Sequence, residues 1–333
     1  MAQMKYFYEL TISSSPHAHS PVTTQTIMRD VLIALAPAMV GAVYFFGFRA
    51  LMVTLVSVAA CVFFEWGYCR MTKKRANLHD LSACVTGVLL AFVCPVTIPY
   101  WTIILGALFA IVLVKMLFGG LGKNVVNPAL AGRAFLFSYP VIMNTWVKVG
   151  FENAAPLIGS TADVVTAATP LASMHQGVLC QESLGQLFLG NIGGSMGETS
   201  ALLLLLGFAY LLVRKVISPR IPVAYIGTVA VLTFLFPQGN DRIAWMLAQV
   251  LSGGLLLGAI FMATDYVTSP VTKLGQLVYG IGCGVLTVVI RYFGGYNEGV
   301  SYAILCMNLC VVLLDRIGRP VKFGAPKKEA AKK

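Results

Sequence analysis

Apolar residues gather in ten runs along the chain, separated by short polar or glycine-rich segments. The runs lie near residues 27–47, 50–69, 80–98, 99–118, 128–142, 199–214, 221–237, 242–264, 271–292 and 299–315. A helix needs about 20 apolar residues to cross about 30 Å of hydrocarbon. The fifth run is short and opens with Asn127-Pro128, which favours a broken or re-entrant helix. The pattern predicts an all-α polytopic membrane protein with about ten transmembrane helices.

Composition supports a membrane protein and argues against a soluble fold. Hydrophobic residues make up 58% of the chain and charged residues 11%, and the mean hydropathy is +0.80. A soluble domain is typically about 45–50% apolar and about 25% charged. The first run lies behind a polar stretch rather than a short basic region, so we expect no cleaved signal peptide.

Short matches between runs suggest an internal repeat. Thr86-Gly87-Val88-Leu89-Leu90 in the third run resembles Ser252-Gly253-Gly254-Leu255-Leu256 in the eighth. The fourth run ends in Phe118-Gly119-Gly120 and the ninth in Phe293-Gly294-Gly295. Each pair is five runs apart, so its members cross the membrane in opposite directions. This indicates two inverted five-helix halves, at residues 27–142 and 199–315.

The basic residues are distributed unevenly between the two sides of the predicted membrane domain. With the N-terminus in the cytoplasm, 19 of the 24 Lys and Arg residues fall on the cytoplasmic side. The outer side receives only four, which are Arg49, Lys148, Arg242 and Arg291. This positive-inside bias explains the net charge of +11 without a nucleic-acid partner. We expect a cytoplasmic arm at 1–26, an external loop at 143–198 and a basic cytoplasmic tail at 316–333.

Glycines, two asparagines and an arginine interrupt the helix pattern between Gly119 and Arg133. In a membrane, irregular backbone is tolerated only where protein or a polar cavity satisfies it. Asn124, Asn127 and Arg133 therefore present groups that can hydrogen-bond a polar heterocycle. The alternative is a tight structural turn whose asparagines cap helix ends. Elsewhere the thirteen acidic residues lie in loops or near run ends, so a chain of buried carboxylates is not expected.

A second unusual stretch lies in the predicted external loop, from Asp163 to Leu171. In one interpretation Thr169 is simply the N-cap of a helix that starts at Pro170. In the other, the Thr169 hydroxyl carries a phosphate ester, which the free N–H groups of a helix start stabilise. The two interpretations are compatible, because a capping threonine can also be modified.

The order Asp-x-x-Thr-Ala-Ala-Thr at 163–169 resembles the motif that flavin transferases recognise when they move FMN from FAD to a threonine. The position that matches the acceptor is Thr169, and Asp163, Thr166 and Ala168 match the rest of the attachment motif. Ala167 stands where glycine is more usual in this motif. The resemblance implies FMN bound covalently to Thr169 through a phosphothreonyl bond.

Three other stretches, at 14–20, 127–135 and 298–308, resemble the D-subunit family of the Rnf ion-translocating electron-transport complex. The B subunit of the sodium-pumping NADH:quinone reductase is a relative with a longer N-terminal region. The resemblance implies a bacterial inner-membrane complex that moves electrons between ferredoxin and NAD and couples this to Na⁺ or H⁺ transport. This chain would not be catalytic alone, and we expect no metal site and no residue that acts as a catalytic acid or nucleophile.

The resemblance also implies cofactors and partners. Related proteins bind a second, noncovalent riboflavin within the spans, for which Asn124, Asn127 and Arg133 are the candidate residues. The partners would be the A, B, C, E and G subunits, with flavin-bearing G nearest, together with lipid and a maturing flavin transferase. Two other classes also fit ten spans: a solute channel or secondary transporter, which has no need of the threonine motif, and a structural assembly protein without flavin.

Overall fold

A computed structural model describes residues 22–73, 78–147, 149–150, 156–157, 168–180, 182–316 and 318. The regular elements in this part of the chain are all helices, as the apolar pattern predicts. Several predictions fall outside the described residues, namely most of the N-terminal arm, Asp163 and Thr166 of the attachment motif, and the tail from 319 onward.

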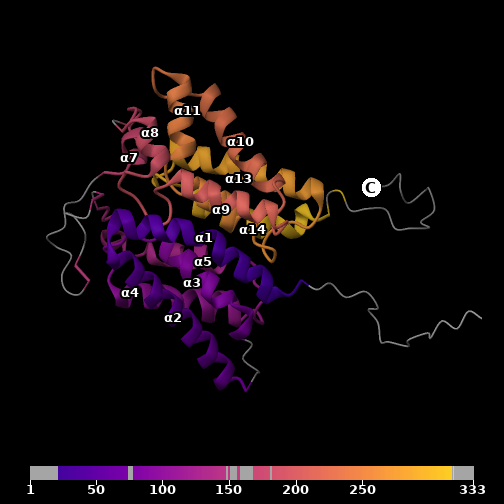
Figure 1. Cartoon of the computed structure of the whole chain (residues 1–333). Helices are drawn as coiled ribbons and strands as arrows, with labels where there is room; N and C mark the ends of the chain where they lie inside the picture. Colours follow the sequence, from indigo (N-terminus) through magenta and orange to yellow (C-terminus); the bar gives the residue numbers. More distant parts are fainter. Residues whose placement is uncertain are drawn as a thin grey trace, which may run out of the picture.

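The first half of the chain forms five helical segments (Figure 1), which are α1 (Thr24–Phe46), α2 (Phe48–Met71), α3 (Ser82–Phe92), α4 (Tyr100–Leu108) with its extension η2 (Phe109–Met116), and α5 (Pro128–Leu136). The short helix η1 (Leu78–Asp80) precedes α3. Backbone N–H groups near the end of η2 bond to the carbonyl five residues earlier, as in Leu117 to Val112 at 3.0 Å. This π-helical geometry widens the helix at its end.

The second half of the chain contains α9 (Ala201–Val213), α10 (Arg220–Leu235), α11 (Arg242–Leu251) followed by α12 (Leu255–Leu257) and η4 (Gly258–Met262), α13 (Lys273–Phe293) and α14 (Val300–Leu314). Three short helices lie between the halves, namely α6 (Pro140–Met143), α7 (Pro170–His175) and α8 (Leu184–Leu189). Each of the ten predicted apolar runs contains at least one helix.

Helix lengths differ from ten uniform spans. In the described part, α1, α2 and α13 are long and apolar enough to cross a membrane alone, and the segment from Arg242 to Met262 is a pair bent by 60°. Five further apolar helices have 10–17 residues, and α5 has nine. The bend falls at Ser252-Gly253-Gly254, where Gly253 has φ +67°. Helices that are too short to cross the membrane end within the fold. Irregular backbone at that depth is tolerated where it is buried in protein or lines a cavity.

The first and second halves of the chain pack against each other. Helix α1 contacts α9, and α5 contacts α14. Within the halves, the contact of α2 with α4 is matched by that of α10 with α13. Figure 1 shows the indigo-to-magenta half and the orange-to-yellow half as neighbouring bodies, with α1 beside α9. This pairing is the arrangement expected if a pseudo-two-fold axis relates the halves.

Buried ion pairs inside the helices change the sequence-based view of two residues. Glu65 lies inside α2 and Lys115 inside η2, and Lys115 Nζ is 2.8 Å from Glu65 Oε2. Lys115 also donates to Ser82 Oγ, which in turn donates to Asp80. Lys115 is one of the 19 residues counted on the cytoplasmic side, and it is 2% exposed. A buried cation needs such a partner because an unpaired charge is expensive to desolvate.

Candidate functional site

Thr169 is the residue immediately before helix α7, and Pro170 is the first residue of that helix. Its backbone is extended, with φ −76° and ψ 150°, and its side chain does not cap the helix. The capping interpretation therefore describes its backbone position, while the hydroxyl is not used for capping. Thr169 is partly buried, and the neighbouring Ala168 is exposed.

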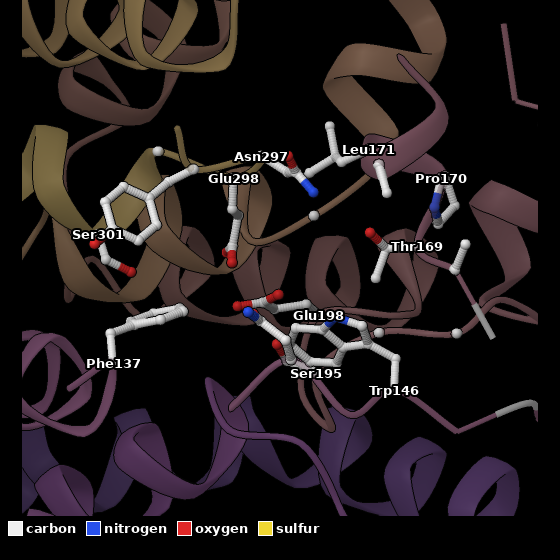
Figure 2. Close-up of a pocket in the computed structure, with 18 of the residues that line it drawn as sticks. Phe137, Trp146, Thr169, Pro170, Leu171, Ser195, Glu198, Asn297, Glu298 and Ser301 are labelled. Atoms are coloured by element: carbon white, nitrogen blue, oxygen red, sulfur yellow. The ribbon is translucent and has the colours of Figure 1, made fainter. Parts of the chain in front are cut away.

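Thr169 lines a cavity of about 740 Å³ between the two halves (Figure 2). Typical small-molecule and cofactor pockets measure about 300–1,000 Å³. The wall comes from α5, from the segments flanking α6 and α7, from the loop before α9 and from the turns before α12 and α14. Figure 2 shows Thr169 on the opposite side of this cavity from Phe137, with Glu198 and Glu298 between them. The site therefore collects residues that are far apart in the sequence.

Helix α5 brings Arg133 to this cavity. The helix begins at Asn127, whose Oδ1 accepts from the N–H groups of Ala129 and Leu130 at 3.0 and 3.4 Å, with Pro128 in the first turn. Gly132 allows close packing, since a Cβ there would lie 3.0 Å from the carbonyl oxygen of Gly106. Arg133 is 1% exposed, and its Nε has no hydrogen-bond partner within the described structure.

Two glutamates converge on the Arg133 guanidinium. Nη1 lies 3.0 Å from Glu298 Oε1, 3.5 Å from Glu198 Oε1 and 2.7 Å from Ser301 Oγ, and Nη2 contacts Glu298 Oε2 closely. The guanidinium thus forms a bidentate pair with Glu298 and a weaker contact with Glu198. Gly299 has φ +69° and precedes α14, so glycine at this position allows the turn that presents Glu298.

Arg291 holds the bent segment around the same cavity. Its Nε donates to the carbonyl oxygen of Glu298 at 3.0 Å, and Nη1 donates to the backbone and side-chain oxygens of Gln249 at 2.6 and 2.9 Å. Nη2 lies 3.4 Å from the carbonyl oxygen of Ser252. These bonds satisfy carbonyl groups that the break between α11 and α12 leaves without helical partners. The charge count places Arg291 at the outer side, but it is a buried structural residue at 2% exposure.

Aromatic rings form another part of the cavity wall. The Tyr296 and Tyr302 ring centroids lie 4.9 Å apart, and Phe137 lies 5.8 Å from Tyr296 and 6.2 Å from Tyr302. The Arg133 guanidinium is positioned over the Phe137 ring at 5.3 Å. Trp146 also lines the cavity. Such a wall suits a flat heterocycle, because aromatic faces pack well against planar rings.

A second, smaller cavity lies at the other end of α5. It measures about 80 Å³, and Asn124, Asn127, Lys115 and Asp265 are among the residues that line it. The Asn127 side chain caps α5 and donates to the carbonyl oxygen of Met262 at 3.3 Å. Asn124 Oδ1 is buried without a hydrogen-bond partner in the described structure. The hydrogen bonds that Asn127 makes to the first turn of α5 and to Met262 support its interpretation as a helix cap.

The structure separates the candidate residues for a noncovalent flavin. Arg133 lines the larger cavity with Thr169, whereas Asn124 and Asn127 line the smaller one. A volume of about 80 Å³ does not accommodate an isoalloxazine, so these residues as arranged do not fit a flavin, and a second flavin stays a prediction of the resemblance. Sequence reasoning gave no role in the site to Glu198 or Glu298, which it counted among the acidic residues in loops or near run ends. Their positions could have indicated a role. Each acid stands immediately before an apolar run, at the outer side of the membrane where Thr169 is also predicted to lie.

If Asn127 is structural, its replacement changes stability and leaves the covalent flavin in place. Asn127→Ala removes the α5 cap, which is worth about 1 kcal/mol, and we expect a lower melting temperature in detergent with unchanged flavin fluorescence of the denatured band. Asn124→Ala is the control, because the Asn124 side chain caps none of the described helices. Its Nδ2 donates one long hydrogen bond, of 3.4 Å, to the carbonyl oxygen of Val126. Loss of an extractable, noncovalent flavin in Asn127→Ala but not in Asn124→Ala would contradict this interpretation.

The larger cavity fits a covalent flavin at Thr169. Its volume is suitable, an aromatic wall faces it, and the partnerless Nε of buried Arg133 lies in its lining. Thr169, Phe137, Tyr296 and Arg133 are the residues in reach of such a group. Asp163 and Thr166 of the attachment motif lie outside the described residues, and Ala168 lines the cavity beside Thr169.

Comparison with known proteins gives full-length matches. Residues 11–324 match the model of the family described as NQR2, RnfD, RnfE. The chain is 45% identical to the D subunit of the Na⁺-translocating ferredoxin:NAD⁺ oxidoreductase complex of Acetobacterium woodii, over 96% of each chain. It is 43% identical to the D subunit of the proton-translocating ferredoxin:NAD⁺ oxidoreductase complex of Clostridium ljungdahlii, over 94% of this chain and 96% of that one. It is 38% identical to the D subunit of the ion-translocating oxidoreductase complex of Stutzerimonas stutzeri, over 90% and 91%.

Proposed function

Because the chain belongs to the NQR2, RnfD, RnfE family, we propose that it is the D subunit of an ion-translocating ferredoxin:NAD⁺ oxidoreductase complex of the Rnf type. Relatives at 43–45% identity over nearly their whole length carry that description. The chain acts as one component of the enzyme and is not catalytic alone. The sequence-based assignment to this family is confirmed by these matches.

We further propose that Thr169 carries FMN through a phosphoester. One observation supports this most strongly: the residue at the acceptor position of the attachment motif lines a cavity of flavin size. When bound, the flavin supplies the electron-transfer chemistry. The chain contributes the surroundings, in which Phe137, Tyr296 and Tyr302 offer packing faces and Arg133 offers a buried cation.

This placement gives the chain a relay role. Thr169 would lie near the outer face, where the flavin-bearing G subunit docks, and electrons would pass between that flavin and the A, B, C and E subunits. Transfer is coupled in the whole complex to Na⁺ or H⁺ movement. Residues of both halves line the cavity, so a group bound there contacts both halves.

The proposed orientation places both termini in the cytoplasm and residues 143–198 outside, in a bacterial inner membrane. The uneven distribution of Lys and Arg supports it. We expect a cysteine introduced at Ser183, an exposed residue in this loop, to react with a membrane-impermeant maleimide in intact cells. A cysteine introduced in the C-terminal tail should react only after permeabilisation. The reverse labelling pattern would contradict the orientation.

In-gel flavin fluorescence separates this function from the two rival classes. A chain with covalent FMN keeps a fluorescent band at about its own mass after full denaturation, because the phosphoester survives when noncovalent contacts are lost. A solute channel or a structural assembly protein gives a dark band. In the cell, deletion of this chain should abolish ferredoxin-dependent NAD⁺ reduction by membranes, and expression of the wild-type chain should restore it.

A further inference from the structure

Two carboxylates and one cation meet in the wall of the cavity that contains Thr169. Glu198 is 6% exposed, and the Glu298 side chain is 18% exposed. The Oε1 atoms of both glutamates contact Arg133 Nη1, and a Cβ added to Gly254 would collide with both of these atoms. The two carboxylates therefore lie against each other. Like charges this close do not both ionise readily, so such a pair tends to hold one proton.

No other described cation neutralises the pair directly. The Arg291 guanidinium bonds to carbonyl oxygens and to the Gln249 amide. His175 Nδ1 bonds to the Arg291 carbonyl oxygen at 2.8 Å. The titratable groups around the pair come from six segments and are Arg133 on α5, Arg291 on α13, His175 on α7, Cys94 between α3 and α4, Tyr296 in the turn after α13, and Tyr302 on α14. Only Arg133 bonds both carboxylates.

The ionisation of the two glutamates follows from these surroundings. Both residues lie outside the regular helices, Glu198 before α9 and Glu298 before α14. Burial, together with the neighbouring Glu298, raises the pKa of Glu198 to about 8. Burial alone would raise the pKa of Glu298, but the Arg133 guanidinium outweighs burial and lowers it. At neutral pH, Glu198 is therefore protonated and Glu298 is ionised against Arg133.

We propose that Glu198 and Glu298 form a proton site coupled to the electron that enters the flavin cavity, an inference that rests on the proposed function. With one shared proton, the two carboxyl groups carry one negative charge, which the positive charge of Arg133 neutralises. Loss of that proton leaves a second negative charge at the cavity and opposes entry of an electron. By linkage, an electron delivered from the flavin of the G subunit raises the proton affinity of the pair to the same extent. When the pair has lost its proton, a hydronium ion of the external water supplies the new one: one O–H bond of that ion breaks and leaves a water molecule, and one O–H bond forms on a Glu198 oxygen.

Infrared spectroscopy of the full-length chain in its complex tests whether the pair holds a proton. A protonated carboxyl has a C=O stretching band that a carboxylate lacks. At about pH 7 an ordinary glutamate, with a pKa of about 4.3, is ionised. We expect the wild-type spectrum to contain such a band and Glu198→Gln to lose it. Glu182→Gln, at a partly buried glutamate outside this cluster, is the matched control and should keep it.

A second variant keeps this test decisive if Glu198→Gln does not assemble. Glu298→Gln should also lose the band, because Glu198 then pairs alone with Arg133 and ionises. Persistence of the full band in either glutamine variant overturns the proposal. Burial also raises the pKa of the partly exposed Asp265, so Asp265→Asn measures any contribution of that carboxyl to the band.

Redox titration of the covalent flavin tests the coupling itself. Around pH 8, near the raised pKa of Glu198, the wild-type midpoint potential should fall more steeply with pH than that of Glu198→Gln, whose charge is fixed. Equal slopes overturn the coupling. If Thr169 proves to carry no flavin, the titration has no signal and the proposed cofactor fails, whereas the infrared result still decides whether the pair holds a proton.

Discussion

Thr169→Ala is expected to remove all covalent flavin from the chain and to abolish electron transfer through the complex. The substitution deletes the only atom at this position that can form the phosphoester. It should barely affect folding, because the Thr169 side chain does not cap α7 and the residue is only partly buried. The denatured band should lose its fluorescence while the amount of chain in the membrane stays at the wild-type level.

Two neighbouring variants make this result specific. Thr166→Ala changes a hydroxyl three residues away that belongs to the recognition motif, so it should retain some covalent flavin. Thr169→Ser keeps a hydroxyl but changes the acceptor type, and we expect weak modification or none. Full fluorescence of the denatured band in Thr169→Ala would show that the flavin is not on Thr169. Complete loss of fluorescence in Thr166→Ala together with that result would indicate Thr166 as the acceptor.

Arg133→Ala is expected to destabilise the membrane domain strongly. It removes the cation that both Glu198 and Glu298 contact, leaving the buried Glu198 and the partly buried Glu298 without a charged partner. Breaking a buried pair by removing one partner costs roughly 3–5 kcal/mol. We expect a clearly lower melting temperature of the purified complex and reduced electron transfer, since the same side chain lines the flavin cavity.

A matched arginine distinguishes this effect from the general loss of a charge. Arg214 pairs with Asp30 at 3.2 Å, but its side chain is 48% exposed. Asp30 is buried at 4% exposure but keeps a hydrogen bond from Tyr210 at 3.3 Å, and water reaches its arginine partner, so Arg214→Ala should lower the melting temperature less than Arg133→Ala does. Combining Arg133→Ala with Glu298→Gln should recover part of the lost stability by removing one of the unpaired charges. Similar effects of Arg133→Ala and Arg214→Ala would contradict the proposed role of the buried cluster.

The helical membrane fold follows from the sequence because apolar periodicity and lipid leave few alternatives. Each of the ten predicted runs contains a helix, and the start of α5 at Asn127-Pro128 follows from the capping signal. Helix lengths are harder to predict. The break at Ser252-Gly253-Gly254 depends on Arg291 satisfying carbonyl oxygens from a different helix, and such a tertiary contact has no local signature.

The candidate site was predictable only in part, for a similar reason. The attachment motif identifies Thr169 locally, and Arg133 is conspicuous because it stands inside an apolar run. That Arg133 meets Glu298 across 165 residues depends on the packing of α5 against α14. The pairing of Lys115 with Glu65 also depends on packing, because the two residues lie on different helices. Charge counting treats each residue alone and so misses such pairs.

Peptide mass spectrometry of the wild-type loop tests the central claim most directly. The chain is produced in cells that contain the flavin transferase, purified with its complex and digested, and the peptide spanning residues 163–171 is fragmented. The account predicts FMN, less one water, on Thr169 and an unmodified Thr166. A peptide in which Thr169 is unmodified, from a complex that is active and was matured with the transferase present, would contradict it.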